Sequence, residues 1–292
     1  MRAAANPLVV CILGKSRSGT SLTARVVNLL GVSLGPRDRL MPSADGNNSA
    51  GFWELQGIAY ANERVLSTLA GTQMGDAWRY PPRLREGWER DPRIATEYAA
   101  ARELLRESFA GADAWGWKDP RTCLTLPFWR RLMPEPRYVI CIRHPLDVAA
   151  SLSVRDSVPR DEALALWVLY MSHAVLNTRG TRRLVVAHES YFDSWERQAE
   201  RLARFLDLPH PSREQRDAIA GHLDERLWHH RDGSGLDVPL DGTTAQLYGL
   251  LESLADGDSG PEAPAWAELD ASARRAAGAA ERTIARFMAE RR

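Results

Sequence analysis

A glycine-containing loop between an apolar run and a helical pattern constrains the fold of this chain most strongly. The loop spans residues 14–21, follows the apolar run at residues 8–13, and opens a helical pattern that extends to residue 30. A strand, a turn of small residues and a helix N-terminus, in this order, form the geometry with which backbone N–H groups and a helix dipole bind phosphate. The loop therefore predicts a phosphate site.

The loop departs from the Walker A pattern of nucleoside triphosphatases at one position. Gly14 and Gly19 have the Walker A spacing, but Thr20 follows Gly19 where those enzymes have lysine. The positive charges lie inside the loop instead, at Lys15 and Arg17. We therefore expect a phosphate site that is not an ATPase site.

Composition restricts the class of protein. The formal net charge of the 292 residues is zero, so bulk electrostatics gives no indication of nucleic acid or of an anionic membrane as partner. No apolar run approaches the roughly 18–20 residues that span a bilayer, and the N-terminus does not resemble a signal peptide. The three cysteines lack metal or disulfide spacing, which predicts a reduced, cytoplasmic protein without a metal site: Cys11, Cys123 and Cys141.

The basic residues are almost all arginine, and the only lysines are Lys15 and Lys118. Codon bias in a GC-rich genome accounts for an excess of arginine, but not for the position of both lysines in motif-like stretches. A compact ammonium and a planar guanidinium are not interchangeable at an anion site. We therefore expect both lysines to be functional.

Short apolar runs predict strands at residues 8–13, 114–117, 138–142 and 184–187. They show little polar alternation, which is typical of parallel strands buried on both faces. Helical patterns lie between and after them, at residues 20–30, 57–69, 92–109, 146–154, 161–177 and 194–206. Gly31 is expected to be the C-terminal cap of the first helix, and Asp161 the N-cap of the helix at 161–177. This alternation predicts a three-layer α/β domain with a central parallel sheet, whose ligands bind at the carboxyl ends of the strands.

Two regions are less regular. Residues 32–53 are rich in Gly, Pro, Ser, Asp and Asn and predict a long functional loop. Residues 256–264 form a polar break before a terminal helix at 266–291. We expect one domain over residues 1–255, and a linker and helix over 256–292 that packs on the domain or on a partner subunit of a homo-oligomer.

A second candidate anion site follows the strand at 138–142. Arg143 emerges at the strand end, and Ser151 lies about two turns into the next helix, so both are placed to hold a second phosphate. The alternative is a strand-to-helix turn with a solvent-facing arginine. Two anion sites after two strands predict a ligand with phosphate groups at both ends.

These motifs resemble those of sulfotransferases that use 3′-phosphoadenosine 5′-phosphosulfate (PAPS). Residues 142–151 resemble the family's 3′-phosphate element, and supporting segments lie at 51–54, 117–121, 124–129 and 227–230. The order and spacing of the two motifs also fit, and the resemblance covers about residues 8–231. The residues that resemble the 5′-phosphosulfate loop are Ser16, Arg17, Ser18, Gly19, Thr20 and Ser21.

Within the family, the chain is similar to bacterial sulfotransferases that act on carbohydrates and other small molecules. The resemblance implies a P-loop NTPase-like α/β/α sulfotransferase fold, with PAPS as donor, adenosine 3′,5′-bisphosphate (PAP) as product and no metal. It also implies a hydroxyl acceptor such as a sugar, a glycosylated metabolite or a nucleoside-type metabolite. No pattern identifies that acceptor or the oligomeric state; residues 32–50 and helices around 78–88 are expected to shape its pocket.

Sulfuryl transfer passes a trigonal SO₃ unit in line from phosphate to an acceptor. By analogy with phosphoryl transfer, catalysis is mostly positioning and neutralisation of charge. Sulfate carries less charge than a terminal phosphate, so Lys15 and Arg17 can replace Mg²⁺. In many family members a lysine stands at the position of Arg17, which leaves open whether Arg17, Lys15 or Lys118 meets the leaving oxygen.

The acceptor hydroxyl needs a base, and Glu54 is the first candidate. The segment Gly-Phe-Trp-Glu at 51–54 resembles a family segment whose carboxylate faces the acceptor, and neighbouring aromatic residues can raise the pKa of Glu54. The alternative is a partner of a helix N-terminus. Asp45 from the same loop, His173 and His188 are further candidates for the base.

Two further segments carry charge. Lys118 is placed to contact sulfate or acceptor, and Asp119 to orient Lys118 or to act as another base; the alternative is an ion network with Arg121 that fixes a turn. Basic residues nearer the C-terminus are expected to close over the nucleotide or to form a solvated helix end: His229, His230 and Arg231.

Two other functions compete with sulfuryl transfer. An ATP- or GTP-dependent kinase predicts a Walker lysine and a Walker B acid; Thr20 occupies the first position, and no good candidate fills the second. A nucleotide-binding protein that has lost catalysis is the other alternative. The retained charged residues argue against it: Lys15, Arg17, Glu54 and Lys118.

Overall fold

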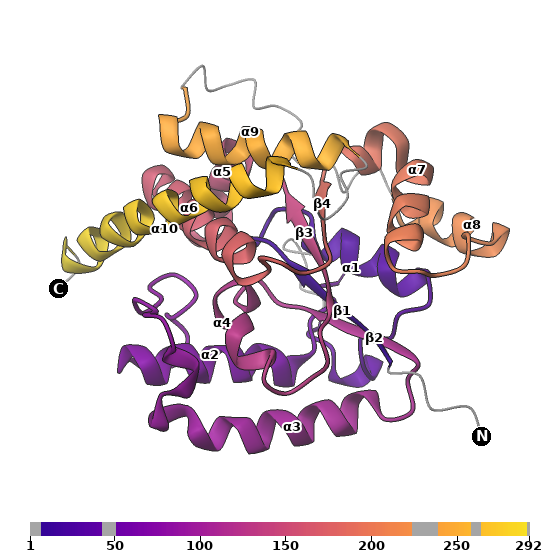
Figure 1. The fold of residues 1–292 in the computed structure, drawn as a ribbon, viewed down its shortest axis with the longest axis horizontal. Coiled ribbons are helices and arrows are strands. Elements are labelled where there is room, and N and C mark those ends of the chain that lie inside the picture. The colour runs from indigo at the N-terminus through magenta and orange to yellow at the C-terminus, as the bar shows by residue number, and fades with distance from the viewer. Residues whose placement is uncertain (1–6, 43–50, 224–238, 258–263, 291–292) are drawn as a thin grey trace.

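The computed structural model describes residues 7–42, 51–223, 239–257 and 264–290, with a parallel β-sheet at its centre (Figure 1). The described sheet has four strands in the order β2-β1-β3-β4. They are β1 (Leu8–Leu13), β2 (Ala114–Lys118), β3 (Arg137–Ile142) and β4 (Arg183–Ala187), all paired in parallel. The four strands expected from the apolar runs are confirmed, each with at most one added residue.

Alternate residues of β1 pack into different hydrophobic clusters. Val9, Cys11 and Leu13 belong to the larger cluster, and Val10 and Ile12 belong to the smaller one on the opposite face. Both faces of the strand are therefore buried, which explains why its sequence shows an apolar run rather than polar alternation.

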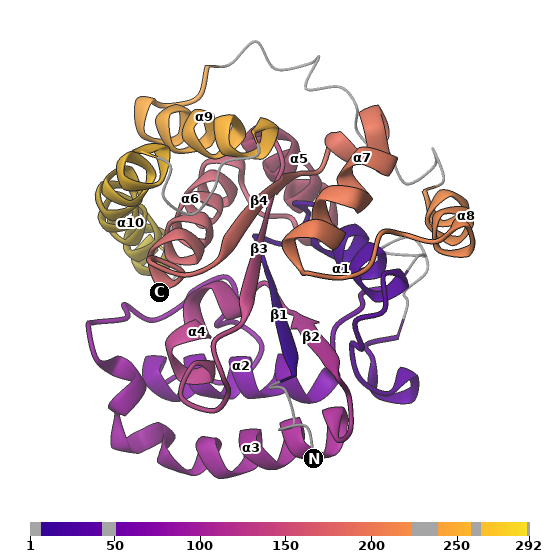
Figure 2. The same ribbon diagram turned by 45° about the vertical axis from the view of Figure 1, so that its right-hand side comes forward.

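Helices cover both faces of the sheet, so the chain forms the three-layer α/β/α arrangement. Figure 2 shows α1, α7 and α8 on one side and α2, α4 and α6 on the other. The first group is α1 (Thr20–Leu29), α7 (Ser190–Phe205) and α8 (Arg213–His222). The second is α2 (Gln56–Ala70), α3 (Ala95–Phe109), α4 (Thr122–Trp129), α5 (Pro145–Asp156), α6 (Arg160–Asn177), α9 (Gly242–Asp256) and α10 (Pro264–Glu290).

Three helices were not expected from the sequence: α4, α8 and α9. Nearly all of α4 is buried, so it lacks the polar face that produces a helical period, and it contains Pro127. The expected N-cap at Asp161 is wrong. Pro159 is the N-cap of α6, and Asp161 lies in the first helical turn, where its charge favours the helix dipole. Gly31 does end α1, with a φ of 108° that favours glycine.

The helices expected around residues 78–88 are absent from this described segment, apart from a 3₁₀ turn that begins there, η2 (Trp88–Arg90). Two consecutive prolines at 81 and 82, and two positive-φ glycines, Gly75 and Gly87, explain the irregular backbone. Residues 32–42 are irregular as expected and contain one 3₁₀ turn, η1 (Arg37–Arg39). A further 3₁₀ turn, η3 (Pro92–Ile94), directly precedes α3.

The strand register brings the carboxyl ends of the strands to one edge. Ile12 of β1 pairs with Lys118, the last residue of β2, and Ile142 pairs with Ala187 at the ends of β3 and β4. The loops that follow the four strands therefore meet at this edge, where the predicted site residues lie.

Helix α10 packs along α6 and α9 (Figure 1). Trp266, Leu269 and Ala273 on its inner side are buried in the larger hydrophobic cluster. Arg183 at the start of β4 pairs with Asp270 of α10 at 2.9 Å and lies over the Trp266 ring. The C-terminal helix therefore shares the core of the sheet's larger face.

Candidate functional site

The loop between β1 and α1 is held in shape by its two glycines. Gly14 has a φ of 146°, and a Cβ atom there would lie 2.7 Å from the Cys141 carbonyl oxygen. Gly19, the N-cap of α1, has a φ of 81°, and a Cβ atom would lie 2.6 Å from His188 Nδ1. Any side chain at either position would be strained and would clash, so the sequence must have glycine at both.

A direct hydrogen bond joins the loop to the second motif. Arg17 Nε donates to Ser151 Oγ of α5 at 2.6 Å. Arg143 is buried at the end of β3, and its Nε lies 3.7 Å from Asp147 Oδ2. Burial lowers the pKa of Arg17, and the positive charges of Arg155 and Arg143 lower it further. The two predicted anion sites therefore form one continuous cationic region.

Three buried polar atoms at this region have no hydrogen-bond partner within the described part of the chain: Ser16 Oγ, Ser18 Oγ and His188 Nδ1. An unpaired buried polar atom costs free energy, and a ligand that bonds to it recovers that cost. Burial, followed by the charges of Arg143 and Arg17, lowers the pKa of His188 to about 3, so its ring is neutral. Hydroxyl donors and guanidinium groups around a helix N-terminus fit an anionic phosphate ester.

The ammonium of Lys15 lies between two aromatic rings. Its Nζ is 5.0 Å from the centre of the Trp78 ring and 4.4 Å from that of Tyr170, and the residue is 1% exposed. Burial, and then the charge of Arg155, lowers the pKa of Lys15 to about 7. The sequence did not indicate this ring pair, because Tyr170 was expected in the core and Trp78 in the acceptor segment.

Glu54 and Lys118 form a buried ion pair beside the loop. Lys118 Nζ donates to Glu54 Oε1 at 2.5 Å and to Ser21 Oγ at 3.2 Å. Lys118 is 2% exposed and Glu54 is 9% exposed. Burial raises the pKa of Glu54, and Lys118 only partly opposes this effect. The structure therefore brings together the first candidate base, the second lysine and the first turn of α1.

Asp119 hydrogen-bonds to Asn62 and Arg121, whereas its neighbour Lys118 hydrogen-bonds to Glu54. It accepts hydrogen bonds from Asn62 Nδ2, from the Arg121 backbone N–H and from the Arg121 guanidinium. Burial alone would raise the pKa of Asp119, but Arg121 holds it below its usual range. Arg121 also pairs with Glu63 at 3.1 Å. The ion-network interpretation of this turn is therefore confirmed for Asp119 and Arg121.

The remaining base candidates differ in their surroundings. Burial lowers the pKa of His173 on α6 to about 4, and His188 lies against the glycine loop as described. Asp45 and the three basic residues near the C-terminus, His229, His230 and Arg231, lie outside the described residues.

A cavity of about 340 Å³ lies apart from the loop, between α5, α6, α9 and α10. Leu146, Leu164, Val168 and Thr244 are among its lining residues, and none of the predicted site residues lines it. We therefore assign it no part in the site.

Two general properties of the described residues bear on the sequence predictions. No described helix is long and apolar enough to cross a membrane, and no described group of three or more His, Cys, Asp or Glu side chains is arranged to hold a metal ion. Three cysteines are buried and unpaired with one another: Cys11, Cys123 and Cys141.

Comparison with known proteins identifies relatives of this fold. Residues 7–212 match a model of the sulfotransferase family, which decides between the sulfotransferase and kinase interpretations. A search of curated proteins finds no match. The sulfotransferase domain from the curacin biosynthetic pathway is similar in structure, with 17% identity, a TM-score of 0.51, and coverage of 84% of this chain and 98% of that one.

Two other solved structures are less similar. Sulfotransferase STF9 from Mycobacterium avium has 14% identity and a TM-score of 0.43, with coverage of 79% of this chain and 69% of that one. Retinol dehydratase in complex with androsterone and the inactive cofactor PAP has 16% identity and a TM-score of 0.40, with coverage of 96% and 81%.

Proposed function

Because the chain belongs to the sulfotransferase family, and is thus a PAPS-dependent enzyme, we propose that it sulfates a hydroxyl group of a small molecule. Suitable acceptors are a sugar, a glycosylated metabolite or a nucleoside-type metabolite. The observation that carries the proposal is the bond between Arg17 and Ser151, which joins two anion sites into one. A ligand with phosphate groups at both ends matches such a region.

The residues present fit the donor. Arg143 and Ser151 would hold the 3′-phosphate. The glycine loop would hold the 5′-phosphosulfate at the N-terminus of α1, where the Ser16 and Ser18 hydroxyls have no partner among the described residues. The loop residues that would take part are Ser16, Arg17, Ser18, Gly19, Thr20 and Ser21. When bound, PAPS supplies a sulfuryl group on a phosphate leaving group, so one S–O bond replaces another and PAP and a proton are released. The neutral ring of His188 adds a polar atom beside the loop.

Glu54 is the proposed base. It accepts the hydroxyl proton of the acceptor on a carboxylate oxygen, and burial suits this role by raising its pKa toward neutrality. Lys118 orients Glu54 through their hydrogen bond and contacts Ser21 of α1. This position connects proton removal with the binding loop.

Three cations neutralise charge in this proposal. Arg17 belongs to the loop and bonds to Ser151, and Lys118 lies between Ser21 of α1 and the base Glu54. We assign both cations to the sulfuryl and leaving-group oxygens. Lys15, held between two rings, contributes a supporting positive charge from within the loop.

The first experiment is calorimetric binding of PAP, AMP and ATP·Mg²⁺ to metal-stripped protein. The proposal predicts tight binding of PAP without metal, weaker binding of AMP, and no preference for ATP·Mg²⁺. Preference for ATP·Mg²⁺ would contradict it.

We also propose that residues 1–255 form the transferase domain and that 256–292 form a linker and a helix that packs on this domain, where Trp266 and Leu269 join its core. The buried thiols support a reducing, cytoplasmic setting, which subcellular fractionation checks. Sedimentation of the purified protein tests the homo-oligomer. Removal of residues 256–292 tests the domain boundary through PAP binding, since the proposed donor residues all precede residue 152.

A further inference from the structure

The two cations of the glycine loop contact different parts of the molecule. Arg17 bonds to Ser151 of α5, in the region that we assign to the phosphate groups. Lys15 instead lies against the rings of Trp78, from the segment between α2 and α3, and of Tyr170, from α6. The binding of the donor phosphates accounts for the position of Arg17, but it does not account for that of Lys15.

Contacts with α6 hold the ring pair around Lys15 in place. Tyr170 Oη donates a hydrogen bond to the Trp78 carbonyl oxygen at 2.6 Å, so the two rings are tied to each other. The next residue, Arg79, donates through Nη2 to Glu162 Oε2 at 2.9 Å. Trp78 therefore belongs to a segment that is fixed against α6, and the Lys15 ammonium has a defined position between the rings.

Lys15 has no carboxylate partner among the described residues, whereas the cations near it have one each. Arg155 pairs with Asp156 at 2.6 Å, and Arg121 pairs with Asp119 at 2.6 Å. Aromatic rings offset only part of the cost of burying an ammonium group. The positive charge of Lys15 is therefore not balanced within this part of the chain, and one negative charge from a ligand would balance it.

Lys15 and the proposed base Glu54 share a neighbour, Arg121. Burial dominates the pKa of both residues, and the charge of Arg121 acts on both: it opposes the rise for Glu54 and adds to the fall for Lys15. Glu63 accepts hydrogen bonds from Arg121 and from the backbone N–H of the residue before Trp78. A continuous set of contacts thus joins Arg121 to the ring pair, and Lys15 lies on the side of the loop that holds the base.

We propose that Lys15 binds a carboxylate group of the acceptor, so that the substrate is a hydroxyl-bearing organic acid such as an acidic sugar or its glycoside. A carboxylate carries one negative charge, which matches the single unbalanced ammonium. Trp78 is only half-buried, and its ring offers an apolar surface to the rest of the ligand. The inference rests on the proposed function, because it takes sulfuryl transfer as the reaction and Glu54 as the base.

Phenyl β-D-glucuronide and phenyl β-D-glucoside test the inference, because the first has a carboxylate where the second has a hydroxymethyl group. Their binding to PAP-saturated protein is measured by calorimetry below pH 7, where Lys15 is charged, on wild type and Lys15→Met. The variant loses a buried charge that lacks a carboxylate partner, so it should fold. We expect it to bind the glucuronide about 10-fold or more weakly than wild type, and the glucoside less than about 3-fold more weakly.

An equal loss for both glycosides, or no preference of wild type for the glucuronide, overturns the inference. It is also overturned if neither glycoside binds to the PAP complex. Weaker PAP binding by Lys15→Met with an unchanged preference between the glycosides would assign Lys15 to the donor and leave the proposed function standing. If wild type does not bind PAP, the proposed function itself fails.

Arg25→Met is the matched control for Lys15→Met. Arg25 is also a cation over an indole ring, but it lies on Trp53, 4.5 Å from the ring centre, and outside the ring pair of Lys15. Its loss should preserve the preference for the glucuronide. If Arg25→Met reduces that preference as much as Lys15→Met does, general positive charge rather than Lys15 attracts the acid, and the inference fails.

Discussion

Arg17 and Ser151 are 134 residues apart in the sequence, and the Arg17 Nε donates a hydrogen bond to the Ser151 hydroxyl at 2.6 Å. Arg17 belongs to the loop after β1, and Ser151 to the helix after β3, which is the neighbouring strand. The contact forms because parallel neighbouring strands end at the same edge of the sheet. Two motifs that are weak when taken separately therefore become one site.

Arg143→Ala should weaken PAP binding far more than AMP binding. The loss of a charge-assisted contact to the 3′-phosphate is expected to reduce PAP affinity roughly 10- to 100-fold. AMP lacks that phosphate, so its affinity should be nearly unchanged. Calorimetry with both ligands measures the difference.

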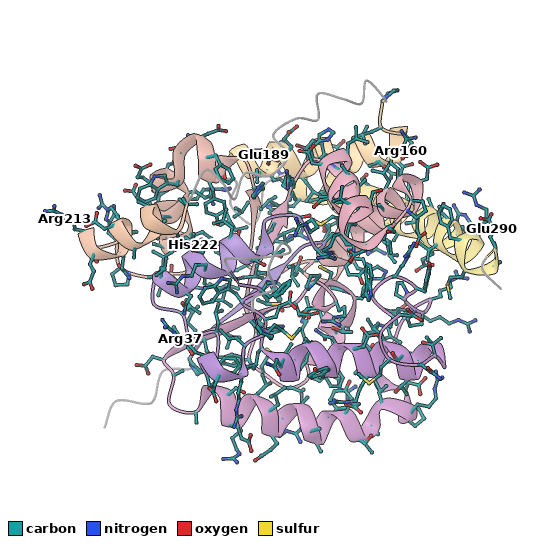
Figure 3. All side chains as sticks on the ribbon, turned by 180° about the vertical axis from the view of Figure 1, so that it is seen from behind. Arg37, Arg160, Glu189, Arg213, His222 and Glu290 are labelled. Atoms are coloured by element: carbon teal, nitrogen blue, oxygen red, sulfur yellow. The ribbon has the colours of Figure 1, made fainter. Side chains whose placement is uncertain are left out.

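Arg213→Ala serves as the matched control. Arg213 lies at the outer end of α8, at one extremity of the molecule (Figure 3), and its side chain is 96% exposed. It should leave both affinities unchanged. Equal weakening of PAP and AMP by Arg143→Ala would refute the assignment of the 3′-phosphate.

Glu54→Gln should lower kcat by roughly 10²- to 10⁴-fold, the range expected for the loss of a general base, and leave PAP affinity close to that of wild type. Because burial raises the pKa of Glu54, the wild-type rate should fall on the acid side at a pH above the usual carboxyl range. Turnover kinetics against pH measures both effects, and PAP calorimetry confirms an intact site. Unchanged turnover would remove Glu54 from this role.

Glu63→Gln provides the comparison for Glu54→Gln. Like Glu54, Glu63 is a buried carboxylate with a cationic partner. It lies on α2 and pairs with Arg121. Its loss should destabilise the fold, since it leaves the partly buried guanidinium of Arg121 with one carboxylate fewer. It should not reproduce the fall in kcat seen for Glu54→Gln.

Lys15 should make the stability of the ligand-free protein depend on pH. Its folded-state pKa of about 7 lies below the ordinary lysine value of 10.5, so the unfolded state binds more protons between these values. The free energy of unfolding should therefore rise with pH from about 7 to about 10, and the cost of charging Lys15 is fully present below that window.

Denaturant unfolding of wild type and Lys15→Met across this pH range measures the effect of Lys15. The variant lacks the titrating amine, so its stability should exceed that of wild type most at neutral pH, and the difference should shrink as pH rises. Parallel stability profiles would show that Lys15 titrates alike in both states.

Gly19→Ala should cost more stability than Gly71→Ala. Both glycines have positive φ, 81° and 67°, but an added Cβ meets His188 Nδ1 at 2.6 Å only at position 19, whereas nothing lies within 4 Å of it at position 71. An alanine in the left-handed backbone conformation costs of order 1–2 kcal/mol of stability at each position. The clash with His188 should cost roughly 1–3 kcal/mol more at position 19. Thermal unfolding compares them, and equal losses would show that the loop yields without cost.

Local pattern predicted much of the architecture. The four described strands follow from apolar runs, because a buried parallel strand has no polar face, and the loop shape follows from Gly14 and Gly19. The three helices α4, α8 and α9 were missed, and Asp161 was placed at the wrong position of α6. A helix buried on nearly all sides, such as α4, has no amphipathic period to detect.

The sequence by itself determined which residue types stand at the carboxyl edge of the sheet, because strand order along the chain and glycine spacing are local properties. Only the tertiary structure decided how those side chains pair. Lys118 contacts Glu54 instead of its neighbour Asp119, and the Lys15 ammonium lies between the rings of Trp78 and Tyr170. These partners come from elements distant in the sequence, and the direction of a side chain depends on what packs against it after the elements have assembled.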